Sequence, residues 1–251
     1  MKKLLLISVS ALFCFSISHA QIKNLFKKDS SGKTGLDKIT QKIPTKGSGS
    51  LSSDDVANGL KEALEVGTQN GTNKLSAVDG FFKDAAVKIL MPPEAEKVEK
   101  TLRSLGMGRQ VDNAILSMNR AAEDAAKSAA PIFIDAIKKM TIQDAFGILR
   151  GGDFAATNYL KDKTTASLTE AFRPVIENSL KKVDATKYWN TVFTTYNKFS
   201  SEKVNTDLPA YVTEKALTGI FFQVGQEEQK IRKDPVARTT DLLKRVFEEQ
   251  K

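Results

Sequence analysis

From residue 52 onward, apolar side chains recur every three to four positions, which is the spacing of amphipathic helices. Short turn signals separate these stripes almost to the end of the chain, and no alternating strand pattern of useful length interrupts them. The pattern predicts one all-α domain over residues 51–251, built from about eight to ten short and medium helices. A domain of this length can bury a substantial hydrophobic core.

Several helix boundaries are marked by capping residues. Ser-x-x-Asp at 52–55 and Thr-x-x-Asp at 141–144 resemble capping boxes, and Asp207 precedes a long apolar-periodic segment. Ser-x-x-Glu at 167–170 is expected to open another helix. Asp234-Pro235 pairs an N-cap residue with a proline suited to the first helical turn, so a final helix is expected to begin there.

Other helix boundaries are marked by proline or aspartate. Pro92-Pro93 is expected to begin a helix and Pro131 to begin another, because proline fits a first helical turn. Asp184 is expected to cap a helix that contains Trp189, a residue we place in the core. Residues 86–90 fit either a helical turn or a brief extended segment.

The stretch Asn119–Phe172 combines alanine-rich helix signals, a Gly151-Gly152 break and many polar side chains. Two glycines before a helix can present backbone N–H groups to an anion. Asp153 follows them directly, however, and its carboxylate would occupy the same place, so we expect Asp153 to cap the next helix. The segment lacks the preceding strand and the Gly-Lys-Ser/Thr ending of a nucleotide-binding loop.

This polar stretch is nevertheless the place where we expect a ligand site. The candidate contacts are Asn119, Glu123, Asp144, Arg150, Asp153 and Thr157. If these side chains are instead buried and hydrogen-bonded to one another, they form a structural network, because buried polar groups need partners. Convergence in an open pocket would favour a ligand site.

Residues 1–20 resemble a secretory signal peptide, with two lysines, an apolar run of about 14 residues and a Ser-His-Ala cleavage site. That run is too short to span a membrane, so we expect no transmembrane segment in a mature chain that begins near Gln21. Cleavage would remove the single cysteine, Cys14, and the single histidine, His19. Thiol nucleophiles, His-based catalysis and Cys/His zinc sites are therefore not expected, and we predict no cofactor.

Carboxylates leave one catalytic alternative open. Glu123 and Glu170 are conceivable partners for glycosidase-type acid/base chemistry, although any helical domain of this size offers such pairs. A hard metal ion would need clustered oxygen ligands, for which the stretch offers Glu123, Asp124, Asp144, Asp153, Thr157 and Asn158. Solvation and helix capping explain the same residues, so we assign neither catalytic nor metal-binding residues.

Most of the net charge of +8 lies near the start of the chain. Residues 21–50 carry seven lysines and two aspartates and end in Gly-Ser-Gly-Ser, which predicts a flexible linker. Residues 51–251 keep a net charge of only +1, so a broad nucleic-acid-binding face is not expected. The linker lysines leave open a weak contact with an anionic envelope surface.

Three sequence segments resemble those of a known family: MNRAAEDAA at 118–126, PIFIDAIKKMTIQDAFGILRGGDFAATNYL at 131–160 and IRKDPVARTTDLLKRVF at 231–247. Over about residues 51–250 the chain resembles the bacterial secreted family catalogued as domain of unknown function 4197. The resemblance implies a helical extracytoplasmic protein of Gram-negative bacteria, with no activity, substrate or cofactor to transfer.

Together these patterns predict a periplasmic or secreted protein that binds an envelope ligand or protein partner, or has a structural role. The alternative is an envelope hydrolase that uses carboxylates, with or without a hard metal ion. Catalysis is the less favoured of the two because no residue pattern specifies it.

Overall fold

A computed structural model describes residues 51–201, 203–234 and 241–248. Its regular elements there are all helical, which confirms the predicted fold class. They are α3 (Ser53–Ser76), the short 3-10 helix η1 (Pro93–Ala95), α4 (Glu96–Ser104), α5 (Gly108–Ala126), α6 (Ala129–Lys138), α7 (Ile142–Arg150), α8 (Ala155–Lys181), α9 (Ala185–Phe199), α10 (Leu208–Lys233) and α11 (Asp241–Glu248). The expected signal peptide, 1–20, and linker, 21–50, lie outside the described residues.

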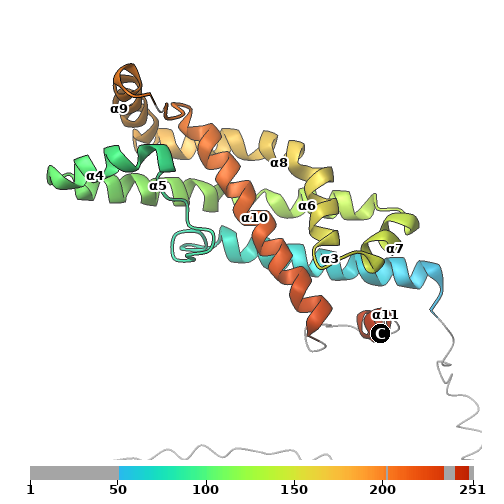
Figure 1. Ribbon diagram of the computed structural model, residues 1–251. Coiled ribbons are helices and arrows are strands. Elements are labelled where there is room, and N and C mark those ends of the chain that lie inside the picture. Colours follow the sequence, from blue (N-terminus) through green and yellow to red (C-terminus); the bar gives the residue numbers. More distant parts are fainter. Residues whose placement is uncertain (1–50, 202, 235–240, 249–251) are drawn as a thin grey trace, which may run out of the picture. The chain divides into compact units, whose positions relative to one another are not determined.

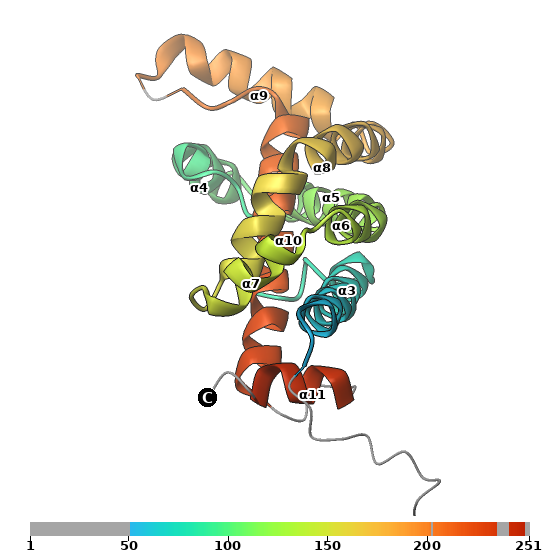
Figure 2. The same ribbon diagram turned by 90° about the vertical axis from the view of Figure 1, so that its right-hand side faces the viewer.

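Helix α10 is the central element of the packing. It contacts α8, α3 and α5, and α5 also packs along α8. Figure 1 shows α10 crossing these helices obliquely. In Figure 2, the later part of α8, α5 with α6, and α3 are viewed close to their axes, one above another, while α10 runs across them. Residues 223 to 231 of α10 are therefore brought next to helices that come much earlier in the chain.

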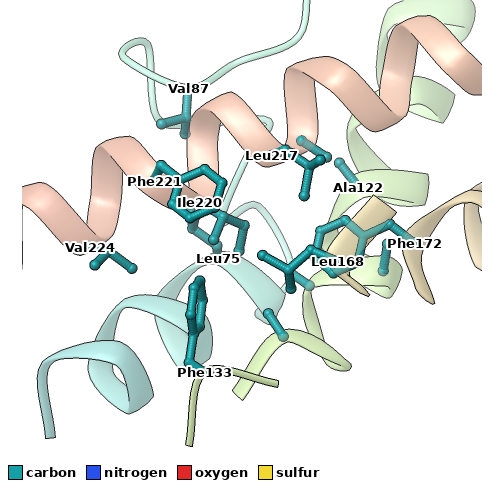
Figure 3. Close-up of a cluster of buried hydrophobic side chains, with 14 of the residues drawn as sticks. Leu75, Val87, Ala122, Phe133, Leu168, Phe172, Leu217, Ile220, Phe221 and Val224 are labelled. Carbon is teal, nitrogen blue, oxygen red and sulfur yellow. The ribbon is translucent and has the colours of Figure 1, made fainter. Parts of the chain in front are cut away.

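The hydrophobic core lies where these helices meet (Figure 3). Phe133 of α6 and Phe221 of α10 contact edge to face, with ring centroids 6.0 Å apart. Leu75, Leu168 and Phe172 are fully buried beside them. Burial of each such side chain contributes about 1.5–3 kcal/mol, so apolar packing holds the helices together.

One helix is longer than the sequence predicted. Residues 167–170 were expected to open a helix, but they lie inside the continuous α8. The hydroxyl of Thr169, for example, donates to the carbonyl of Thr165, four residues earlier, as in the interior of a helix. A buried stripe runs through the whole helix at four-residue spacing: Leu160, Thr164, Leu168, Phe172, Ile176 and Leu180. Tertiary packing of this stripe overrides the local capping signal.

The start of α8 also differs from the prediction. Phe154 is the N-cap residue and makes no side-chain cap bond, while Asp153 is exposed and does not cap the helix. The free N–H groups of Ala156 and Thr157 instead donate to the carboxylate of Glu228 in α10, at 3.0 and 2.8 Å. The prediction for Asp153 is wrong because a carboxylate from a distant helix occupies the capping position.

The local capping boxes are confirmed. Both Ser52 with Asp55 and Thr141 with Asp144 make the reciprocal bonds of that motif. Asp207 likewise accepts a bond from the N–H of Ala210. These motifs need only residues within one helical turn, so sequence alone suffices to find them.

The remaining boundaries are confirmed in part. The helical turn predicted at Pro93 is present, whereas α6 begins at Ala129, two residues before Pro131. Asp184 occupies the N-cap position of α9 but has a φ of 52° and makes no cap bond. The start predicted at 234–235 falls partly outside the described residues, and the described part of α11 begins at Asp241.

Between α3 and η1 the chain forms an irregular segment, residues 77–92, which we call the 77–92 segment. The expected Asp-Gly turn is present: Asp79 has a φ of 70°, and the N–H of Gly80 donates to the carbonyl of Ala77. Residues 85–87 form a turn and 88–92 belong to no regular element, so neither a helix nor a strand forms at 86–90.

Candidate functional site

Of the six residues expected to contact a ligand, Asn119 and Glu123 lie together on α5 and the others lie elsewhere. Asn119 and Glu123 are buried on α5, Asp144 belongs to the capping box of α7, and Thr157 binds Glu228 at the start of α8. Arg150 and Asp153 are exposed. Across the described part of the chain, no side-chain hydrogen bond or ion pair joins any two of the six.

Asn119 and Glu123 hold the 77–92 segment against α5. The Asn119 amide accepts a bond from the N–H of Ile89 and donates one to its carbonyl, both at 2.8 Å. The Glu123 carboxylate accepts bonds from the N–H groups of Phe81 and Phe82, at 3.1 and 3.2 Å. These side chains supply the hydrogen bonds that a neighbouring strand would otherwise provide.

An ion-pair network completes this attachment. Arg120 donates to Glu123 and to Asp79, each at 2.6 Å. Hydrogen bonds from Lys83 and then Arg120 hold the pKa of Asp79 below its ordinary value. Glu123 of α5 thus holds the 77–92 segment through backbone N–H groups. Asp79, which belongs to that segment, is held to α5 through Arg120.

The attached segment forms one wall of a hollow along α10. This hollow, which we call the α10 groove, has a volume of about 320 Å³. Its lining consists of Ala86, Val87, Lys88, Ile89, Leu90, Pro93, Tyr211, Lys215, Thr218, Gly219 and Phe222. A volume of this size suits a small molecule.

Gly219 lets the 77–92 segment rest directly on α10. A Cβ atom at this position would lie 2.6 Å from a ring carbon of Phe81 and 3.3 Å from the Cβ of Val87. Tyr211 fixes the other end of the contact, because its hydroxyl donates to the carbonyl of Leu90 at 2.9 Å. Burial raises the pKa of Tyr211 to about 12, so the hydroxyl keeps its proton at physiological pH.

Two lysines line the α10 groove: among the described residues Lys88 makes no ion pair, and Lys215 makes only a long one. The Lys88 ammonium lies 4.1 Å from the ring centre of Phe82, and that of Lys215 lies 5.7 Å from the ring centre of Tyr211. The carboxylate nearest to Lys215 is that of Glu214, at 4.0 Å and largely exposed. Cation–π contacts position an ammonium group but do not cancel its charge.

A second hollow, of about 430 Å³, lies on the outer side of the same segment. Its charged groups are already paired: Lys74 with Asp84 at 2.9 Å, and Lys83 with Asp79 at 2.8 Å. Paired charges offer less to a ligand than the lysines of the α10 groove. We therefore take the α10 groove as the candidate site.

Sequence reasoning did not find the α10 groove. Tyr211, Lys215, Thr218 and Phe222 recur at helical spacing on one face of α10, and this mixed aromatic and polar stripe was the available signal. The sequence of the other wall, residues 86–90, fitted either a helical turn or an extended segment. Pairing with distant residues, such as that of Ile89 with Asn119 30 positions away, fixes that wall in place.

The residues considered for acid/base or metal chemistry are spread apart or already bonded. Glu123 is buried in α5, whereas Glu170 is exposed on α8. Asp124 binds Lys127 and Ser179. Within the described ranges, no group of three or more acidic, His or Cys side chains is arranged to hold a metal ion.

The fold and the α10 groove define an all-α domain in which an irregular segment and a long helix enclose a small hollow. The family model described as "Protein of unknown function (DUF4197)" matches residues 50–248. The chain therefore belongs to that family, and the predicted resemblance is confirmed. No curated protein and no solved structure matches the chain. Among the described helices, none is long and apolar enough to cross a membrane.

Proposed function

We propose that this protein is a non-catalytic binding protein of the cell envelope whose ligand occupies the α10 groove. One observation carries the proposal: Lys88 and Lys215, which rest on aromatic rings, line a hollow of about 320 Å³ that is otherwise largely apolar, and the one carboxylate paired with them in the described part of the chain, that of Glu214, is 4.0 Å from Lys215 and largely exposed. Ligand sites typically combine an apolar lining with a few placed polar groups. The α10 groove has this composition.

The bonding of the buried carboxylates favours binding over hydrolysis. Glu123 accepts bonds from two backbone N–H groups and Arg120, and Glu228 from two backbone N–H groups, Thr157 and Arg232. A general acid or base must reach the proton it transfers to substrate. Carboxylates whose oxygens already bond the protein's own backbone are poorly placed for that task.

Occupancy of the α10 groove can be measured through a single thiol. In a Cys14→Ser background, Thr218→Cys places the sole cysteine in the lining of the groove. With an environment-sensitive thiol dye attached, we expect at least one compound in a screen of envelope metabolites to change its emission saturably. The matched control is Thr165→Cys, an exposed threonine on α8 that bonds the carbonyl four residues earlier, as Thr218 does.

The dye attached at position 165 should not respond to the same compounds. If thermal melting reveals ligands that stabilise the protein while the dye at position 218 stays silent, the α10 groove is not the site. If no compound in the screen gives either signal, the proposal of a ligand-binding function fails.

We also propose that the chain is exported and cleaved after Ala20, because residues 1–20 have the three regions of a signal peptide. Expressed in a Gram-negative host, the periplasmic product should have the mass of residues 21–251. Ala20→Leu should block cleavage, since a large residue there does not suit signal peptidase. Ala11→Leu makes the same change inside the apolar run and should be processed normally. An uncleaved wild-type chain in the cytoplasm would refute this location.

A further inference from the structure

The chemistry of the α10 groove limits what kind of ligand it suits. This step rests on the proposed function and concerns the ligand's head group and body. Lys88 and Lys215 are the charged residues of the lining. Several other lysines, such as Lys100 and Lys139, lie 2.6–2.7 Å from a carboxylate oxygen. The groove lysines are held on aromatic rings instead and keep their charge for an anion.

Acidic groups lie near the groove on the Tyr211 side. Glu214 is 4.0 Å from Lys215, and Glu94 contributes to the raised pKa of Tyr211. Neither residue belongs to the lining. Their carboxylates disfavour a second anionic group beside Tyr211, so the arrangement favours a ligand with one anionic head over a polyanion.

The neutral polar groups of the lining already have partners. The Tyr211 hydroxyl donates to the carbonyl of Leu90, and the Thr218 hydroxyl donates to that of Glu214. A sugar needs many free donors and acceptors, because each buried hydroxyl without a partner costs free energy. The α10 groove is therefore poorly suited to glycans.

The rest of the lining is apolar and partly open. Leu90, on the 77–92 segment, and Phe222, on α10, both line the hollow and are 55% and 42% exposed. A ligand body placed between them would remove this apolar surface from water, which is favourable. The volume of about 320 Å³ holds roughly ten non-hydrogen atoms.

We infer that the α10 groove binds a single-chain amphiphilic carboxylate, with the head group at Lys88 and Lys215 and the chain between Leu90 and Phe222. The ammonium groups supply charge complementarity for the head. The apolar walls supply the driving force for the chain. A free molecule of about ten carbons matches the volume.

The test compares three ten-carbon chains below their aggregation limits: decanoate, decanol and decylammonium. Binding to the purified full chain is followed by thermal melting, and by the dye at position 218. Decanoate should bind at least tenfold more tightly than the other two. Equal binding of decanol or decylammonium would overturn the inference, because it would show that charge has no role.

Variants test the contribution of the two lysines. Lys88→Gln combined with Lys215→Gln should weaken decanoate binding at least tenfold and leave decanol binding unchanged. The control double variant, Lys100→Gln with Lys139→Gln, removes two exposed lysines elsewhere and should bind decanoate as the wild type does. Unaltered decanoate binding after loss of both groove lysines would refute the placement of the head group.

Failure of the inference and failure of the proposed function give different results. If none of the three chains binds but another compound changes the dye signal at position 218, the ligand class is wrong and the binding function stands. If no compound of any kind reaches that position, both fail.

Discussion

Replacing Glu228 by glutamine is expected to lower the free energy of unfolding by about 3–5 kcal/mol, the usual cost of removing one partner of a buried ion pair. The Glu228 side chain is 5% exposed and bonds Arg232 at 2.8 Å. Its carboxylate also accepts hydrogen bonds from the N–H groups of Ala156 and Thr157. The variant removes the charge of the Glu228 carboxylate beside Arg232, which keeps its bond to the carbonyl of Ile148, and turns an amide towards the start of α8. Urea unfolding followed by circular dichroism measures the change.

Asp153→Asn is the matched control, because Asp153 is the residue that the local sequence marks as the cap. Its side chain is 66% exposed and lies 3.6 Å from Lys233, so its replacement should change stability by no more than about 0.5 kcal/mol. A large effect at 153 together with a small effect at 228 would contradict the observed capping of α8.

Asn119→Ala is expected to lower the free energy of unfolding by about 2–6 kcal/mol. The substitution leaves the buried N–H and carbonyl of Ile89 without partners, and each such group costs about 1–3 kcal/mol. Amide hydrogen exchange should accelerate in the 77–92 segment more than in α8 or α10, since the attachment of that segment is lost first.

The control for this prediction lies on the same helix. Asn113 is exposed on α5, so Asn113→Ala should leave both the stability and the exchange pattern close to those of the wild type. A loss below about 1 kcal/mol in Asn119→Ala, with unchanged exchange in the segment, would show that the amide does not hold it.

The sequence predicted features that depend on near neighbours. The capping boxes at 52–55 and 141–144 and the Asp207 cap join residues three positions apart, and all are present. The amphipathic stripes gave the fold class for the same reason. Where two local signals competed, as at 167–170, the long buried stripe of α8 prevailed.

The candidate site depends on distant pairs, which is why sequence reasoning missed it. Tyr211 bonds Leu90 across 121 positions, and Ile89 meets Asn119 across 30. Asn119 and Glu123 were correctly noticed as unusual polar residues in an alanine-rich helix. Their observed bonds, however, are to the wall of the α10 groove and not to its interior. A ligand role for the six predicted residues stays a prediction.

The capping of α8 by Glu228 also has a consequence for the order in which the chain folds. During synthesis the first turn of α8 emerges long before the carboxylate that satisfies its N–H groups, because residue 228 follows 71 positions after Thr157. The nascent α8 is thus expected to fray at its start until α10 is complete and docks. Ordering of α8 and docking of α10 then belong to one late cooperative step, whose rate is limited by bringing distant segments together.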